Sequence, residues 1–237
     1  MIGFFDSGKG GLTVLAKAIK EGVGGDVLYF GDETNAPFGS KDKESLKRIV
    51  RDDCRFLERL GCEKVVCACN TASVASENMR LNIPFSRLRY EFEAIKGDAL
   101  FLGTEFSVKN FASRSNERIK CLALPLLATL IDDDASEEEI FDYVSRTAKG
   151  IAAPTLILGC THYGLVKGIL SRVFLPEKII EIGDSVSKAD IYGDESPLRV
   201  FFLDYQYKKY SLVLERLLED ERVNTFSLPL NKHIPLK

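Results

Sequence analysis

Two short segments combine a cysteine with other side chains that can bind a ligand or move a proton. Cys69 begins the run Cys-Asn-Thr-Ala, and Cys160 begins the run Cys-Thr-His-Tyr, whose His162 is one of only two histidines in the chain. Each cysteine follows an apolar run typical of a buried strand and precedes a helical pattern. Open parallel sheets bind their ligands at such strand ends. We therefore expect one site that is approached by a thiol from each of two sides.

The residue types leave several chemistries open for these thiols. Two thiols that face each other across a carbon atom suit proton removal on one face and proton return on the other. A zinc site would use Cys67, Cys69, Cys160 and His162, although the spacings are shorter than the usual two to four intervening residues. A cysteine hydrolase would use His162 as its base, and one cysteine would then have no role. Cys69 alone could also be a small buried apolar residue.

The surroundings of Cys69 also suggest how its thiol would behave. The predicted helix after Cys69 offers backbone N–H groups to a carboxylate. The same helix end predicts a thiol pKa below the usual ~8.5.

Glycines follow the first predicted strand in the run Asp6-Ser7-Gly8-Lys9-Gly10-Gly11. Glycines permit tight turns and let backbone N–H groups approach a ligand, so a ligand carboxylate could lie here. Asp6 could orient a substrate ammonium group or a catalytic thiol, or it could simply cap the turn. A phosphate-binding loop is disfavoured, because Gly10 stands where that motif needs a hydroxyl for Mg²⁺.

A second loop with candidate residues follows the predicted strand 27–30. The functional interpretation places Asp32 at the strand end and residues 37–39 as a lid over the ligand. The alternative is an ordinary strand-to-helix loop in which Ser40 or Asp42 caps the next helix.

Composition narrows the class of protein. The 237 residues are 45% hydrophobic, which is enough for a core, and the net charge of −3 does not predict a nucleic-acid partner. No run approaches the ~18–20 apolar residues of a membrane span. The N-terminus lacks a basic n-region, so we expect no signal peptide, a cytoplasmic location and reduced cysteines. Cys54, Cys62 and Cys121 are expected to be small buried residues.

Strand and helix patterns alternate along the whole chain. Strands are predicted at 2–5, 27–30, 64–68, 99–102, 119–122, 155–158, 178–182, 198–203 and 223–228. Helices are predicted at 12–19, 43–60, 72–81, 107–113, 136–148, 165–173 and 207–218. This alternation indicates an α/β fold of doubly wound, mainly parallel sheets. Irregular stretches near 85–98 and 183–197 suggest a discontinuous first domain, 1–90 plus 190–237, around a second domain, 91–189, with the site in the cleft between them.

Four motifs taken together carry a family resemblance. They are D-S-G-x-G-G-L-T-V at 6–14, F-G-D-x-T-x-x-P-F-G at 30–39, A-C-N-T-A-S at 68–73 and L-G-C-T-H-Y at 158–163. In this order and at these separations, the chain resembles the glutamate racemases of the aspartate/glutamate racemase superfamily. The resemblance implies two pseudo-symmetric α/β domains, a homodimer, no cofactor or metal, and a small-molecule substrate, glutamate. It also implies a cytoplasmic enzyme that supplies D-glutamate for peptidoglycan.

The resemblance also assigns roles to individual residues. Cys69 and Cys160 would be the proton-transfer thiols, acting on the D and the L enantiomer respectively, with Asp6 and His162 as their helpers. The substrate contacts it implies are Ser7, Asp32, Pro37, Phe38, Gly39, Asn70, Thr71, Thr104, Ser107 and Thr161.

The chain departs from the family pattern at three positions. Phe38 replaces a usual tyrosine, and Ser107 stands where threonine is usual. Residues 124–128 match a stretch that normally ends in a glutamate beside the catalytic histidine, and this chain has Ala128 there. The expectation is therefore that His162 lacks a carboxylate partner and is harder to keep protonated.

Two alternative functions remain. One is a racemase for aspartate or another acidic amino acid, and the other is a non-catalytic amino-acid-binding or thiol-regulated protein on the same scaffold.

The first testable prediction concerns metals. Because the motifs contain no lysine in a recognisable pyridoxal context and no credible metal set, catalytic activity should persist after dialysis against a chelator. Turnover measured before and after dialysis checks this. Activity that is lost on chelation and restored by zinc would favour the metal site instead.

Overall fold

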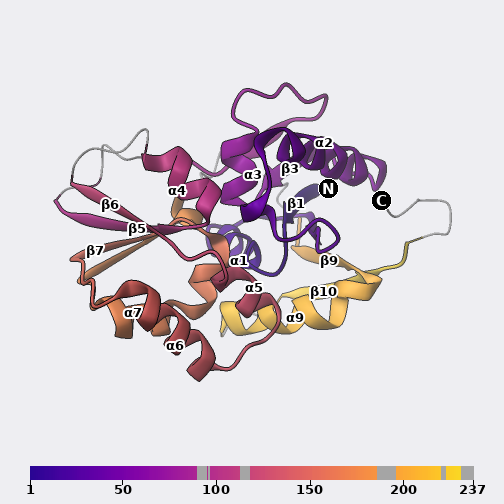
Figure 1. The fold of residues 1–237 in the computed structure, drawn as a ribbon. Helices are drawn as coiled ribbons and strands as arrows, with labels where there is room; N and C mark the ends of the chain where they lie inside the picture. Colours follow the sequence, from indigo (N-terminus) through magenta and orange to yellow (C-terminus); the bar gives the residue numbers. More distant parts are fainter. Residues whose placement is uncertain (90–94, 96, 113–117, 186–195, 220–222, 231–237) are drawn as a thin grey trace.

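The computed structural model describes residues 1–89, 95, 97–112, 118–185, 196–219 and 223–230. Its strands form two sheets that lie side by side in Figure 1. The six-stranded sheet comprises β1 (Ile2–Asp6), β2 (Asp26–Gly31), β3 (Lys64–Cys67), β4 (Phe85–Arg87), β9 (Arg199–Leu203) and β10 (Asn224–Leu228). The four-stranded sheet comprises β5 (Ala99–Gly103), β6 (Ile119–Ala123), β7 (Thr155–Leu158) and β8 (Lys178–Glu181).

The two sheets repeat one strand arrangement. The larger sheet contains the order β2-β1-β3-β4, and the smaller sheet has the order β6-β5-β7-β8. Every strand pair in both sheets is parallel. In each half, therefore, the first strand is central and the third strand in sequence order lies beside it. Cys69 follows β3 and Cys160 follows β7, so the two thiols occupy equivalent places in the two halves.

Helices cover both faces of each sheet (Figure 1). The α-helices are α1 (Leu12–Lys20), α2 (Lys43–Arg59), α3 (Asn70–Ala75), α4 (Glu105–Ala112), α5 (Leu127–Asp132), α6 (Glu137–Ala148), α7 (Lys167–Phe174) and α9 (Asp204–Leu218). The 3₁₀ helices are η1 (Phe38–Ser40), η3 (Thr161–Val166) and η4 (Ile182–Ser185).

Alternating side chains along the central strands place one hydrophobic core on each face. In β1, Phe4 packs with α1 and α9, whereas the neighbouring Phe5 packs with α2. In β5, Leu102 belongs to the core under α5, α6 and α7, and Phe101 packs on the opposite face with Phe111 of α4. Successive residues of a strand point to opposite faces, so both central strands are buried on both sides. The predicted doubly wound α/β class is confirmed.

The chain returns to the larger sheet after it completes the smaller one. β9 pairs with β2, and β10 pairs with β9 at the edge. The predicted domain boundaries, at 90 and 190, fall outside the described residues and stay a prediction. Within the described residues, no helix is both long enough and apolar enough to cross a membrane.

Three local predictions were wrong or incomplete. The predicted helix 72–81 ends at Ala75, because the Arg87 side chain donates hydrogen bonds to the carbonyl oxygens of Ser76 and Met79. Those carbonyls are therefore occupied by an arginine instead of continuing the helix. Strand β4, which supplies Arg87, was not predicted. Nor was α5, a single short helix that begins at Leu127 and ends at Asp132.

Candidate active site

The strand ends of the two sheets enclose one cavity of about 320 Å³. Such a volume suits a small molecule. Eleven of the predicted site residues line it: Ser7, Pro37, Phe38, Gly39, Cys69, Asn70, Thr71, Thr104, Cys160, Thr161 and His162. The other three, Asp6, Asp32 and Ser107, lie behind this lining.

Both thiols sit where an extended strand end turns into a helical segment. Cys69 precedes α3 and Cys160 precedes η3, both with extended backbone angles, and neither side chain caps the turn that follows. Cys69 is 5% exposed and Cys160 is 8% exposed. The two sulfurs therefore contact the cavity from different sheets and are largely shielded from bulk water.

The helix end does not lower the pKa of Cys69, contrary to the sequence prediction. Burial raises the pKa of this thiol well above its ordinary value, and the nearby charge of Asp6 adds to the effect. Desolvation disfavours the thiolate more than a helix of only six residues favours it. Burial therefore favours the thiol form of Cys69 over the thiolate.

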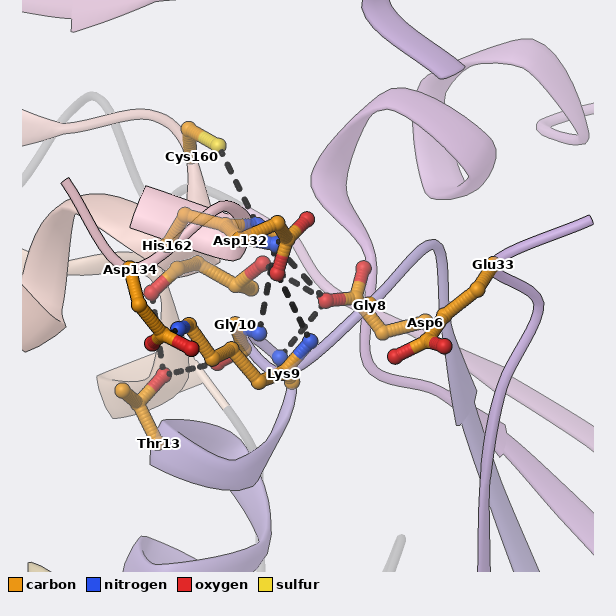
Figure 2. A network of polar contacts seen from close by, with 12 residues as sticks. Asp6, Gly8, Lys9, Gly10, Thr13, Glu33, Asp132, Asp134, Cys160 and His162 are labelled. Carbon is orange, nitrogen blue, oxygen red and sulfur yellow. Dashed lines mark hydrogen bonds and ion pairs between the residues drawn. The ribbon is translucent and has the colours of Figure 1, made fainter. Parts of the chain in front are cut away.

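The buried His162 lies at the centre of a network of polar contacts with acidic groups, shown in Figure 2. Its Nε2 atom is 2.9 Å from Oδ2 of Asp132, and its Nδ1 atom is 3.9 Å from Sγ of Cys160. Oδ2 of Asp6 lies 3.8 Å from Nδ1. The imidazole therefore bridges the Asp132 carboxylate and the Cys160 thiol that lines the cavity.

The carboxylate partner of His162 overturns the expectation based on Ala128. Ala128 lines the cavity and has no carboxylate. The carboxylate that the family resemblance places at position 128 is instead provided by Asp132, one helical turn further along α5. The signal in the sequence was the acidic run 132–134, which follows five mostly apolar residues at the end of what proves to be a helix. Residues on α5 one turn apart lie on the same side of the helix, which explains the misplacement.

The neighbouring charges decide the protonation state of His162. Burial alone would lower the pKa of His162, but the charge of Asp132 and its hydrogen bond, aided by Asp6, raise the pKa well above the usual range. In return, although burial acts to raise the pKa of Asp132, His162 holds it below its ordinary value. We therefore assign an imidazolium–carboxylate pair, in contrast to the sequence expectation of a histidine that is hard to protonate.

The glycine-rich loop after β1 packs directly against this pair. The N–H of Gly11 donates to Oδ2 of Asp6 at 2.6 Å, and the backbone nitrogen of Gly10 lies 3.3 Å from Nε2 of His162. A Cβ atom on Gly10 would overlap the His162 ring. The glycines thus allow close approach to side chains of the protein, and their N–H groups are not arranged around a phosphate.

Asp6 connects the two thiol segments. Its Oδ2 atom accepts a hydrogen bond from the Thr161 hydroxyl at 3.3 Å, and burial raises its pKa. Its other oxygen, Oδ1, is buried without a hydrogen-bond partner among the described residues. Asp6 is therefore both the cap of its own loop and a neighbour of Cys69 and His162.

Hydroxyl and amide groups join the two halves on the opposite wall. The Thr71 hydroxyl is 3.1 Å from that of Thr104, and both contact the Ser107 hydroxyl, at 3.3 and 3.0 Å. The Asn70 amide donates to Ser107 and to the carbonyl of Gly159, but its Oδ1 atom has no partner within the described structure. These groups form a polar wall that can bind a carboxylate or an ammonium group.

The loop after β2 divides into a lining part and a supporting part. Pro37, Phe38 and Gly39 line the cavity, and Gly39 packs against Thr104 so closely that a side chain would collide with it. Asp32 instead accepts hydrogen bonds from the backbone and side chain of Asn35, so its carboxylate shapes the loop.

Several charged residues at the cavity were not predicted from the sequence. Glu33 and Lys209 form an ion pair at 3.0 Å, and Glu105 and Asp133 also line the space. Lys209 belongs to α9, far along the chain, and no local pattern near the motifs could have indicated it. Among the residues that the structure describes, no group of three or more His, Cys, Asp and Glu side chains is placed to hold a metal ion.

Comparisons with known proteins agree with this geometry. No family model matches the chain. It is 32% identical over 242 residues to the glutamate racemase of Aquifex aeolicus, an alignment that covers 92% of each protein. Among solved structures, it is similar to glutamate racemase from Thermus thermophilus in complex with β-chloro-D-alanine, with a TM-score of 0.71, 28% identity and coverage of 97% and 96% of the two chains. It also matches the fold of the RacE1 isoform of glutamate racemase from Bacillus anthracis, with a TM-score of 0.76 and 24% identity over 96% of this chain and 97% of that one.

The two-sheet fold with facing strand ends and a thiol on each side is therefore that of an amino-acid racemase. Because its alignment with the glutamate racemase of Aquifex aeolicus combines this identity with this coverage, the chain belongs to the glutamate racemase family.

The contact between His162 and Asp132 gives a testable prediction. The variant Asp132→Asn keeps the size of the side chain but removes its charge, so the pKa of His162 should fall. A protonated histidine is lost as the pH rises through its pKa, so the corresponding limb of the pH–rate profile should move to lower pH. Near neutral pH, turnover should fall by about 10²-fold or more, the scale of a lost acid–base group.

Turnover measured from pH 5 to 10 on the wild-type and variant enzymes checks this. Glu138→Gln, on the exposed first turn of α6, is a suitable control for the loss of one negative charge. A folded Asp132→Asn enzyme with an unmoved limb would show that His162 does not depend on this carboxylate.

Proposed function

We propose that this protein interconverts L- and D-glutamate without a cofactor, by proton transfer at Cα between Cys69 and Cys160. One observation carries the proposal: two thiols at equivalent strand ends of two sheets line a single small cavity. Membership of the glutamate racemase family supports the reaction and the substrate. The substrate-analogue complex of the relative from Thermus thermophilus supports a small amino acid as the ligand.

The proposed reaction is a two-base proton exchange. In the L-to-D direction, a Cys160 thiolate takes the Cα proton and leaves the electron pair on the substrate as a carbanion. The Cys69 thiol then gives its proton to the opposite face and becomes the thiolate. The reverse direction starts with the Cys69 thiolate and the Cys160 thiol, so atoms and charge balance in both directions.

The two thiols would receive different help. The imidazolium of His162 stabilises negative charge on the sulfur of Cys160, 3.9 Å from its Nδ1 atom. Burial and the nearby carboxylate of Asp6 instead raise the pKa of the Cys69 thiol. Its thiolate must therefore form with the substrate ammonium group close by, after water has left the cavity.

The substrate would be held by the polar wall and by the strand-end loops. Oδ1 of Asn70 is a buried acceptor without a partner in the described structure, and an ammonium group could satisfy it. The hydroxyls of Thr71 and Thr104 can donate to a carboxylate. Such contacts orient Cα between the sulfurs, and this positioning contributes much of the rate.

The cellular role and the assembly belong to the same proposal. D-Glutamate made here would supply peptidoglycan synthesis, and the enzyme would act as a homodimer, as the family resemblance implies. Sedimentation of the purified protein would show whether the dimer forms.

Hydrogen exchange tests the reaction directly. Purified protein in D₂O should convert L-glutamate into D-glutamate and incorporate one deuterium at Cα, which chiral chromatography and mass spectrometry detect. L-Aspartate in parallel tests the choice of side-chain length. Deuterium incorporation with aspartate alone would reassign the substrate, and none with either amino acid would favour a binding protein.

Mutation of each thiol tests the mechanism. Cys69→Ser and Cys160→Ser should each reduce racemisation by at least about 10³-fold, because a hydroxyl is a far weaker acid than a thiol and both faces need a functional group. Cys54→Ser and Cys62→Ser are matched controls at buried cysteines away from the cavity, and should affect thermal stability more than turnover. Near-normal turnover in either active-site variant would rule out the two-thiol mechanism.

A further inference from the structure

The loop after β1 contains a buried lysine that the reaction as proposed does not use. Lys9 stands between the two glycines that approach Asp132 and His162, and the residue is only 4% exposed. Burying an ammonium group is costly unless a negative partner compensates it. A lysine at this place in the loop therefore needs a structural reason.

Its partner lies on the other half of the molecule. The Lys9 ammonium forms an ion pair with the carboxylate of Asp134, two residues after Asp132, as Figure 2 shows. Asp134 adopts a left-handed backbone angle, φ 56°, and its N–H donates to the carbonyl of Ile131. A left-handed residue is typical of the position just after a helix end, so the ion pair anchors Lys9 to the segment where α5 terminates.

The same loop also contacts Asp132 itself. The Lys9 backbone N–H donates to Oδ1 of Asp132 at 3.3 Å, while Oδ2 contacts Nε2 of His162 at 2.9 Å. One residue of the first half therefore holds the end of α5 at two points, by its backbone and by its ammonium group. Asp132, which is 23% exposed at its side chain, has freedom to turn away from His162 if this hold is lost.

We propose that Lys9 is a positioning residue: through its ion pair with Asp134, it holds the end of α5 so that Asp132 stays against His162. This inference rests on the proposed function only in its consequence for turnover. Without the ammonium group, α5 would end less rigidly and the carboxylate would spend less time on the imidazole. His162 would then lose its main support as an imidazolium.

The direction in which the pKa of His162 changes distinguishes the positioning role of Lys9 from a direct electrostatic effect of its charge. The ionisable groups that face His162 are Asp132 from α5, Asp6 from β1 and Cys160 from the end of β7, and Lys209 of α9 acts on Asp132. Removing a nearby cation would by itself raise the pKa of a histidine. Loss of the Asp132 contact lowers it. A positioning role and simple charge repulsion therefore predict opposite signs.

The test is an NMR titration of the histidine ring signals in Lys9→Met, which retains the backbone N–H and much of the side-chain length. With only two histidines in the chain, His233→Gln assigns the spectrum. We expect the pKa of His162 to fall by about one pH unit or more and kcat near neutral pH to fall about tenfold, with a smaller change in KM. Lys9→Arg should restore most of both, because Asp134 is 77% exposed at its side chain and has room for a guanidinium group.

The matched control is Lys17→Met, which removes the ion pair between α1 and Asp184, at 3.4 Å, without touching α5. It should leave the His162 titration unchanged. A His162 pKa that is unchanged or raised in folded Lys9→Met overturns the proposal, as does a Lys9→Arg variant that is as impaired as Lys9→Met. Because the titration needs no turnover, it remains decisive even if the enzyme does not racemise glutamate.

Discussion

The structure depends on one buried contact, the imidazole of His162 held between the carboxylates of Asp132 and Asp6. A charged imidazole at 1% exposure is stable only with anionic partners, and here they come from both halves of the molecule. Asp6 ends a strand of the larger sheet, whereas Asp132 ends a helix packed on the smaller sheet. The contact therefore joins the two sheets at the wall of the cavity, and Gly10 must lack a side chain to let it form.

The two halves of the molecule share one strand order, but the groups that surround the thiol differ between them. The strand order β2-β1-β3-β4 recurs as β6-β5-β7-β8, and the thiols follow the third strand of each set. Within the described residues, the neighbouring groups do not repeat, because the imidazole of His162 lies beside Cys160 and no imidazole lies beside Cys69. A repeated scaffold thus places two thiols at one cavity, while the local residues give each thiol a different environment.

Much of the fold and of the candidate site could be predicted from the sequence, and the physical reason differs between the two. Alternating strand and helix patterns gave the fold class, and strand-end motifs placed Cys69, Cys160, Asp6 and His162 together. Asp132 was misplaced by one helical turn, because short apolar helices such as α5 have weak signals and its pairing with His162 is a long-range contact. The predicted shift of the Cys69 pKa had the wrong direction, because burial and the charge of Asp6 arise only from the tertiary structure. Lys209 reaches the cavity from a helix nearly 50 residues after Cys160, which no local pattern records.

The two thiols have different neighbouring groups, and this difference has a thermodynamic consequence for the proposed reaction. Mirror-image amino acids have the same free energy in water, so the equilibrium constant between them is one. The ratio kcat/KM must then be equal in the two directions, however different the acid–base groups on the two faces are. Whatever factor the imidazolium beside Cys160 contributes to kcat/KM for one enantiomer must therefore appear in kcat/KM for the other, and only its division between kcat and KM can differ. The asymmetry of the site governs how tightly each enantiomer is held, and the direction of net flux is left to the concentrations of the two.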